Sequence, residues 1–217
     1  MARNVRILIV DDHYVVRQGL KAILLEHFPE AAFGEASNGQ EGVDLVRTQP
    51  WNLVLLDISM PNRGGLDALK DIRQSKPKLP VIVLSIHPED QFAVRVLKLG
   101  AFAYLRKESA GSELAQAVEA ALSGARHITP AVAEKLANQL QEDWKGQAHE
   151  ALSDREYQVM CMLASGKTVK EIASAISLSG KTISTYRSRV LEKMHLKNNS
   201  QIMRYAVRQG LVDAEGT

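Results

Sequence analysis

The chain of 217 residues has one cysteine, few aromatic residues and no long apolar run. Because Cys161 is the only cysteine, an intramolecular disulfide and a cysteine-based zinc site are excluded. No apolar stretch approaches the roughly 20 residues that a membrane-spanning helix needs. The N-terminus lacks the basic stretch, apolar core and small-residue cleavage site of a signal peptide. These absences predict a cytoplasmic protein with no membrane partner.

Charge is spread unevenly along the chain, although the formal net charge is only +2. Residues 1–124 carry 14 Lys and Arg against 15 Asp and Glu, and residues 125–150 carry 3 against 4. Residues 151–217 carry 10 against 6. A polyanionic partner is therefore expected at the C-terminal part, although a solvated basic face would give the same composition.

Short apolar runs alternate with amphipathic segments through the first 124 residues. Strands are predicted at 5–10, 31–36, 53–56, 81–84 and 102–106, and helices at 14–27, 39–49, 65–75, 89–99 and 109–123. Nearly all-apolar strands are typical of a sheet buried on both faces. The alternation predicts an α/β doubly wound, five-stranded parallel sheet over residues 1–124. The C-terminal ends of all strands then meet at one edge, where such sheets bind ligands.

Residues 125–150 have a different composition. Thr129 and Pro130 are typical of a helix start, as N-cap and first helical residue, and the helix is predicted to continue to about Gln141. The segment from Glu142 to Ala151 is charged and poor in apolar residues. Residues 125–150 are therefore interpreted as a linker helix followed by a flexible tether.

Residues 151–217 read as helical throughout, which predicts a small all-α domain. Two capping boxes, Ser153 with Glu156 and Thr168 with Glu171, open the first two helices. The first is expected to stop at Gly166. The second ends near residue 176, a third spans 181–195, and a fourth runs from 199 to 210.

Acidic residues follow two of the predicted strands of the first domain. Asp11 and Asp12 follow the first strand, and Asp57 follows the third. Carboxylates crowded at one edge raise one another's pKa unless a cation relieves them. Mg²⁺ takes oxygen ligands and commonly shares its site with phosphate, so we expect it here.

Two donors complete this edge. Ser85 closes the fourth strand with a hydroxyl, and Lys107 closes the fifth with an ammonium. Both can hold the oxygens of a phosphoryl group. A nucleophilic carboxylate, a metal site and two phosphate donors are the equipment for phosphorylating Asp57. Taken singly, each residue has a plainer interpretation as a helix cap, a turn residue or a surface lysine. Only their combination at the strand ends favours the site.

Residues 4–124 resemble the receiver domain of bacterial response regulators, a flavodoxin-like fold. The resemblance is carried by Ile9-Val10-Asp11-Asp12-His13, Leu55-Leu56-Asp57-Ile58-Ser59-Met60-Pro61, Val83-Leu84-Ser85 and Gly100-Ala101-Phe102-Ala103-Tyr104-Leu105-Arg106-Lys107. It implies that Asp57 accepts a phosphoryl group from a sensor histidine kinase.

The same resemblance implies the roles of the surrounding residues. Mg²⁺ would be held by Asp12, Asp57 and the backbone carbonyl of Ser59, with Asp11 acting through water. Ser85 and Lys107 would grip the phosphoryl oxygens. Tyr104 would turn inward on activation, although a half-buried strand aromatic is an equally good interpretation of that residue.

Two features of residues 4–124 depart from the commonest receiver pattern. The loop after Pro61 reads Asn62-Arg63-Gly64-Gly65, and we expect its turn to survive because glycine permits positive φ. Ile86 is bulky enough to slow entry of a phosphodonor. Ser59 and His87 stand at positions that tune phosphate lifetime in the family.

The second and third helices of the C-terminal domain are separated by about four residues, which predicts a helix-turn-helix. The apolar face of the first helix of this pair, the second helix of the domain, is formed by Ile172, Ala173 and Ile176. The apolar face of its partner, the third helix of the domain, is formed by Ile183, Val190, Leu191 and Met194. The outward face of the third helix carries hydroxyls and cations, which suit phosphates and base edges in a major groove. A solvated basic hairpin would show the same spacing.

Residues 150–212 resemble the LuxR-type helix-turn-helix. The resemblance rests on Leu152-Ser153-Asp154-Arg155-Glu156, Gly166, Lys170-Glu171-Ile172-Ala173, Leu178-Ser179, Lys181-Thr182-Ile183 and Lys193-Met194. Joined to a receiver, it implies the NarL/FixJ family of transcriptional regulators. The positions that match base-reading residues are Lys181, Ser184, Thr185 and Ser188. Those that match phosphate contacts are Thr182, Arg187, Arg189 and Lys193.

The leading hypothesis is a non-enzymatic, phosphorylation-switched transcription factor that binds promoter DNA as a homodimer when active. An aspartyl-phosphate phosphohydrolase is one alternative. Such enzymes usually place a second aspartate two residues after the nucleophile, where this chain has Ser59. A constitutive DNA-binding protein with an idle receiver is another. It is disfavoured because every phosphorylation residue is present.

Overall fold

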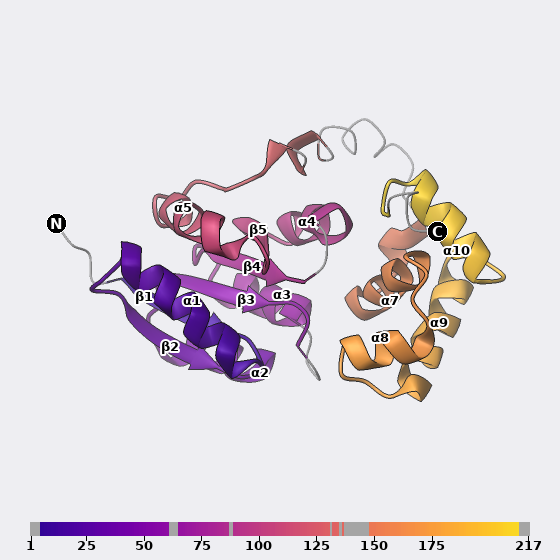
Figure 1. The fold of residues 1–217 in the computed structure, drawn as a ribbon, viewed down its shortest axis with the longest axis horizontal. Helices are drawn as coiled ribbons and strands as arrows, with labels where there is room; N and C mark the ends of the chain where they lie inside the picture. The colour runs from indigo at the N-terminus through magenta and orange to yellow at the C-terminus, as the bar shows by residue number, and fades with distance from the viewer. Residues whose placement is uncertain are drawn as a thin grey trace. The chain divides into compact units, whose positions relative to one another are not determined.

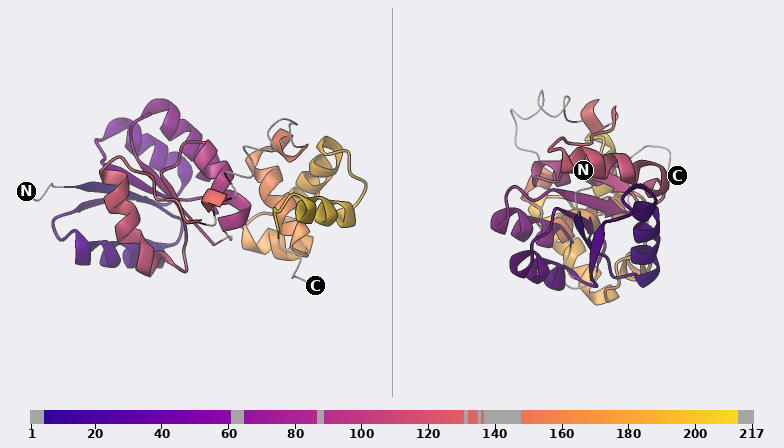
Figure 2. Two further views of the ribbon diagram at one scale, coloured as in Figure 1. Left: turned by 90° about the horizontal axis from the view of Figure 1, so that it is seen from above. Right: turned by 90° about the vertical axis from the view of Figure 1, so that its left-hand side faces the viewer.

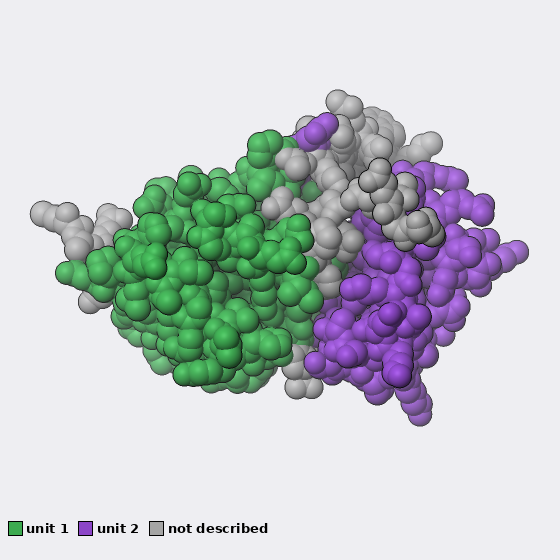
Figure 3. All heavy atoms as spheres, viewed as in Figure 1, with its two compact units in different colours: residues 1–132 green, residues 133–217 purple. Residues whose placement is uncertain are grey.

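The computed structural model describes residues 5–60, 65–86, 89–130, 132–134, 136 and 148–212, and only the backbone of residues 89–91. The chain divides into two compact units, residues 1–132 and residues 133–217 (Figure 3). The first unit contains strands and helices, and the described part of the second contains helices.

The first unit alternates strands and helices (Figure 1). In chain order they are β1 (Arg6–Val10), α1 (Tyr14–His27), β2 (Ala32–Ala36), α2 (Gly39–Thr48), β3 (Leu53–Asp57), α3 (Gly65–Ser75), β4 (Val81–Ser85), α4 (Glu89–Lys98), β5 (Ala103–Arg106) and α5 (Ala110–Leu122). The strands form one parallel sheet in the order β2-β1-β3-β4-β5. The doubly wound fold predicted from the sequence is confirmed.

Helices cover both faces of the sheet (Figure 2), and the side chains that alternate along the strands form a core on each face. Ile7, Ile9, Leu53 and Leu55 point to the face covered by α1 and α5. Their neighbours Leu8, Val10, Val54 and Leu56 are equally buried. Because both faces are covered, β3 and β4 are buried along their whole length and apolar up to their last residue, which is why their positions could be predicted. The parallel arrangement brings the C-terminal ends of all five strands to one edge.

The segment after α5 only partly follows the sequence prediction. Thr129 acts as predicted at a helix start, since its hydroxyl accepts from the Val132 N–H at 3.4 Å. The predicted helix end at Gln141 lies outside the described residues. The prediction of a flexible tether was wrong for its last four residues, which form the 3-10 helix η1 (Ala148–Ala151). His149 is buried there, and its ring nitrogen Nδ1 lies 2.9 Å from the Tyr205 hydroxyl.

The second unit is helical. After η1 come α7 (Asp154–Ala164), α8 (Val169–Ala175), α9 (Gly180–Lys193) and α10 (Asn199–Arg208). Both capping boxes are present, and Gly166 ends α7 with a φ of 80°. Ile172, Ile183 and Val190 are fully buried where α8, α9 and α7 pack together. Within the described part of the chain, no helix has both the length and the apolar character to cross a bilayer.

Candidate functional site

The predicted acidic site forms at the C-terminal edge of the sheet. Asp57 is the last residue of β3 and Ser85 the last of β4, while Asp11 and Lys107 directly follow β1 and β5. The backbone N–H of Lys107 donates to the Ser85 carbonyl at 2.8 Å, which extends the pairing of β4 and β5 beyond the strand. These side chains therefore come together because each lies at or directly after the end of a strand, a position that could be predicted from the sequence.

Lys107 joins the two buried carboxylates of the site. Its Nζ lies 2.8 Å from Asp57 Oδ2 and 2.7 Å from Asp11 Oδ2. The carboxylates of Asp57 and Asp11 are 0% and 1% exposed, whereas the lysine side chain is 14% exposed. A cation reaching in from the rim thus balances charge that burial would otherwise make costly.

Burial controls the electrostatics of this cluster. It raises the pKa of Asp57, the nearby Asp11 carboxylate raises it further, and Lys107 opposes both. Burial alone would lower the pKa of Lys107, but the charges of Asp57 and Asp11 outweigh it and raise that pKa. Two carboxylates that share one ammonium carry an excess of negative charge, which a further cation would relieve.

Four side chains could hold such a cation. One ligand atom from each of Asp11, Asp12, His13 and Asp57 lies within 4.8 Å of the others. Asp12 Oδ1 is buried and lies 3.0 Å from His13 Nδ1. The buried hydroxyl oxygen of Ser59 has no hydrogen-bond partner among the described residues. Carboxylate oxygens are ligands that a hard divalent cation prefers, so the set of side chains fits Mg²⁺.

The backbone after β3 folds back onto the nucleophilic carboxylate. The Ser59 N–H donates to Asp57 Oδ1 at 2.8 Å. Gly65, the first residue of α3, packs against the backbone of Asp57 and Ile58. A Cβ at residue 65 would lie 2.0 Å from the Asp57 carbonyl oxygen. The glycine is therefore required for space, and the positive φ expected in this loop is absent at Gly65. Residues 61–64 lie outside the described residues.

The predicted switch residues belong to β4 and β5. Ser85 is fully buried, and Tyr104 is 3% exposed in β5. The interpretation of Tyr104 as a half-buried aromatic is therefore wrong for this structure. Ile86 is 49% exposed next to Ser85. The prediction for His87 falls outside the described residues.

Sequence reasoning missed a second network behind the acidic loop. Arg17, in the first turn of α1, donates from a terminal nitrogen to the Asp11 carbonyl at 2.7 Å and from Nε to Glu35 Oε2 at 2.6 Å. Hydrogen bonds from Lys21, Arg17 and Gln18 lower the pKa of Glu35 to about 2. Arg17 thus ties the loop that carries Asp11 to β2. A glutamate in the middle of a strand was the one signal that could have revealed it.

The helix α9 carries the predicted nucleic-acid face. Lys181, Ser184, Thr185, Ser188 and Arg189 are exposed. The three hydroxyls each donate to a carbonyl of their own helix at 2.9 to 3.1 Å. Side chains four residues apart lie on one side of a helix, so the predicted base-reading positions share one exposed stripe.

Three residues predicted to contact phosphates have partners within the second unit. Thr182 Oγ1 lies 2.8 Å from the N-cap hydroxyl of Ser179. Arg187 Nε donates to Asn199 Oδ1 at 2.7 Å. The ammonium of Lys193 lies 2.6 Å from Glu156 Oε2 and lowers the pKa of that carboxyl against the effect of burial. Arg189 therefore remains the most accessible of the predicted phosphate contacts.

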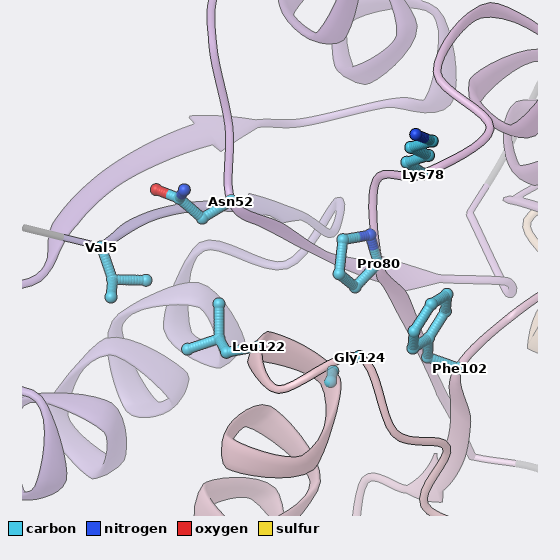
Figure 4. Close-up of a pocket in the computed structure, with 8 residues that line it drawn as sticks. Val5, Asn52, Lys78, Pro80, Phe102, Leu122 and Gly124 are labelled. Atoms are coloured by element: carbon cyan, nitrogen blue, oxygen red, sulfur yellow. The ribbon is translucent and has the colours of Figure 1, made fainter. Parts of the chain in front are cut away.

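A pocket of about 280 Å³ opens at the other edge of the sheet (Figure 4). Val5, Asn52, Pro80 and Phe102 line it, and each comes just before a strand. The pocket therefore lies at the amino ends of the strands, whereas the acidic site lies at their carboxyl ends, where such sheets bind ligands. The pocket and the acidic site are separate.

Two family models match this chain. Residues 7–119 match the response regulator receiver domain, and residues 150–206 match the bacterial regulatory proteins of the luxR family. The chain belongs to the NarL/FixJ family of response regulators. The receiver match covers the whole acidic site from Asp11 to Lys107, and the luxR match covers α7, α8 and α9.

Relatives resemble this response regulator along its whole length. It is 35% identical to the response regulator UvrY of Escherichia coli strain K12 over 212 residues, which cover 97% of each chain. It is 34% identical to the response regulator GacA of Pseudomonas viridiflava over 97% of this chain and 99% of GacA. RcsB from Salmonella enterica serovar Typhimurium, solved on the promoter rprA with the phosphomimetic BeF₃⁻, aligns with a TM-score of 0.57. Its identity is 25%, over 93% of this chain and 98% of RcsB.

Proposed function

We propose that Asp57 accepts a phosphoryl group from a sensor histidine kinase and that this modification controls promoter binding by α9. The observation that carries the proposal is the placement of the Lys107 ammonium 2.8 Å from Asp57 Oδ2 and 2.7 Å from Asp11 Oδ2. An ammonium at this position neutralises charge on the nucleophile and is also a donor for phosphoryl oxygens.

The reaction joins an Asp57 carboxylate oxygen to phosphorus and breaks the bond between phosphorus and the kinase histidine. The product is a mixed anhydride on Asp57. Lys107 and Ser85 then donate to the phosphoryl oxygens, and the Ser59 N–H holds the carboxylate in position. We assign the receiver no reaction other than this transfer and the later loss of its own phosphate.

Mg²⁺ is the cofactor that we assign to the acidic cluster. Asp12, Asp57 and the backbone carbonyl of Ser59 would hold it, with Asp11 acting through water. When bound, it supplies positive charge that offsets the carboxylates and the incoming phosphate. The buried Asp12 oxygen supports this assignment, because it lies close to the Asp11 and Asp57 carboxylates, and crowded carboxylates are costly unless a cation meets them.

Ser85 and Tyr104 are the proposed switch. Phosphate on Asp57 would draw in the Ser85 hydroxyl and favour the inward position of Tyr104. Tyr104 is buried in this structure, which supports the proposal that its side chain can occupy an inward position. The second unit would then bind two half-sites of promoter DNA as a homodimer, because one small domain makes few base contacts.

We assign residues 1–124 to the receiver, 125–150 to the linker and 151–217 to the DNA-binding domain of a cytoplasmic transcription factor. The complex of RcsB with promoter DNA and BeF₃⁻ supports this division of labour. In α9, Lys181, Ser184, Thr185 and Ser188 would read bases. Thr182, Arg187, Arg189 and Lys193 would meet phosphates.

The test uses the full chain with acetyl phosphate and Mg²⁺, followed by intact-mass measurement and DNA binding. The wild-type chain should gain one phosphoryl group, and its affinity for a duplex selected by this chain from a random DNA library should change. Asp57→Asn should abolish both effects. Asp67→Asn, which alters an exposed aspartate of α3, is the matched control and should behave like the wild type. An Asp57→Asn chain that still gains the group and responds would refute the proposal.

A further inference from the structure

The stripe of hydroxyls on α9 has a fixed hydrogen-bond polarity. Ser184 Oγ lies 2.9 Å from the Gly180 carbonyl, Thr185 Oγ1 lies 3.1 Å from the Lys181 carbonyl, and Ser188 Oγ lies 3.1 Å from the Ser184 carbonyl. A carbonyl oxygen has no proton to give. In each of the three pairs the hydroxyl must therefore be the donor.

A serine or threonine hydroxyl has one proton and two acceptor lone pairs. Because the proton of each of these hydroxyls is directed into the helix, only the lone pairs face outward. All three side chains are exposed, so these lone pairs are accessible to a ligand. A hydroxyl can in general act as a donor or as an acceptor, but the hydroxyls of this stripe present only acceptors to a ligand.

The major groove of DNA has two exocyclic amino groups that donate, adenine N6 and cytosine N4. Guanine and thymine present N7, O6 or O4 acceptors at the corresponding edge. An acceptor facing an acceptor gains no hydrogen bond and leaves both groups desolvated. The polarity of the stripe thus separates the four bases into two that it can bind and two that it disfavours.

We propose that Ser184, Thr185 and Ser188 select operator bases by accepting hydrogen bonds from the exocyclic amino groups of adenine or cytosine. This inference rests on the proposed function, in which α9 lies in the major groove. Lys181 lies on the same stripe and is the only pure donor among the predicted base-reading residues. It supplies the opposite preference, for guanine acceptors. The operator should thus combine a guanine step with adjacent positions that carry amino groups.

The experiment begins with selection of binding sites from a random duplex DNA library by the full-length, acetyl phosphate-treated chain. Each adenine of the enriched site is then replaced by purine, which lacks N6, and each cytosine by 2-pyrimidinone, which lacks N4. The two replacements show which base supplies the amino group. Loss of one hydrogen bond should weaken binding by roughly three- to tenfold at the contacted positions.

Variants then connect each amino group with its hydroxyl. Thr185→Val keeps the shape of the side chain and removes the acceptor, so purine or pyrimidinone at its partner position should cause no further loss. Thr185→Ser keeps the acceptor and should respond like the wild type. Ser184→Ala should lose its response in the same way. Ser200→Ala, at an exposed serine of α10, is the matched control for a removed hydroxyl.

The outcomes separate this inference from the proposed function. Enriched sites whose affinity is unchanged by every amino-group deletion would refute acceptor readout and leave promoter binding intact. An equal response of Thr185→Val and wild type at every position would refute it as well. A library in which no sequence is enriched would overturn the proposed function, and the inference with it.

Discussion

The acidic edge of the sheet and the outer stripe of α9 hold their polar groups in opposite ways. At the sheet edge, Asp11 and Asp57 are 1% and 0% exposed, and their charge is balanced by Lys107. On α9, Ser184 and Thr185 are exposed, and their hydroxyl protons are satisfied by their own helix. A buried charge without a partner costs free energy, whereas an exposed hydroxyl can form hydrogen bonds with water.

This difference separates stability from recognition in the two units. Substitutions at the sheet edge should change both the chemistry and the free energy of unfolding, because a lost partner leaves a buried charge. Substitutions on the α9 stripe should change DNA binding alone. The predictions below test this separation, from the largest expected effect to the smallest.

Lys107→Met should lower the free energy of unfolding by about 3 kcal/mol when Mg²⁺ is absent, since it leaves two buried carboxylates without their cation. This is the lower end of the usual range because the lysine is 14% exposed. Urea unfolding followed by circular dichroism measures it. Lys76→Met, at an exposed position just after α3, should change stability by less than about 0.5 kcal/mol.

The double variant Lys107→Met/Asp57→Asn provides the internal check. Removing one of the two carboxylates should restore much of the stability that Lys107→Met loses. If the double variant is no more stable than Lys107→Met alone, repulsion between buried carboxylates is not the cause of the loss.

Glu156→Gln should destabilise the helical unit by about 2 kcal/mol at pH 7, because a charge-assisted hydrogen bond to Lys193 is lost. Glutamine still suits this position of the capping box, so the cap itself is preserved. Burial raises the pKa of Glu156, but Lys193 and Ser153 outweigh it and hold that pKa below 4.5. The stabilisation is therefore complete above pH 4.5 and fades as pH falls through the lower folded value.

Thermal unfolding at a series of pH values measures this effect. The stability gap between wild type and Glu156→Gln should be constant well above pH 4.5, the ordinary value of the free carboxyl, and should close as pH falls below that value towards the lower folded pKa. Glu192→Gln, at an exposed position of α9 next to Lys193, is the control and should show no such convergence. A gap between wild type and Glu156→Gln that stays constant with pH would show that the ion pair is not its source.

Arg17→Gln should weaken Mg²⁺ binding by roughly three- to tenfold, because the Asp11 loop loses a charge-assisted hydrogen bond that fixes its position. Isothermal titration calorimetry of the unphosphorylated chain measures the affinity directly. Arg47→Gln, on α2 and about half exposed, is the matched control. Equal affinities for Arg17→Gln and Arg47→Gln would rule out a positioning role for Arg17.

Arg189→Ala should flatten the dependence of log Kd on log salt concentration by about one unit, as expected for one lost phosphate contact. Lys193→Ala should flatten it less, because Glu156 already neutralises that ammonium. Fluorescence anisotropy on non-specific duplex DNA between low and moderate salt measures both slopes. A larger change for Lys193 than for Arg189 would mean that the ion pair opens on DNA.

The sequence predicted the fold of the first unit because central strands such as β3 and β4 are buried on both faces. A buried apolar run such as Leu53–Leu56 has one interpretation, and strand ends then bring Asp57 and Lys107 to one edge. The capping boxes fixed the starts of α7 and α8 for a similar reason, since each is a local pattern with a local partner.

Contacts between distant residues could not be predicted in this way. The sequence has no local signal that Lys193 pairs with Glu156, 37 residues away. Glu35 in β2 indicates that a cation is needed, but it does not indicate that Arg17 supplies it. The polar composition around His149 indicated a tether, yet a buried contact with Tyr205 fixes that residue. The polarity of the α9 hydroxyls likewise depends on rotamers, which residue type alone does not determine.

Gly65 shows how a residue without a side chain can restrict mutation of a functional site. Any side chain at this position would meet the backbone of Asp57, because even a Cβ would lie 2.0 Å from its carbonyl oxygen. A saturation library scored for phosphorylation should thus tolerate substitutions at residue 65 as poorly as at the acceptor itself. The positions at which substitution impairs this site therefore include residues that must be small, as well as residues that take part in the chemistry.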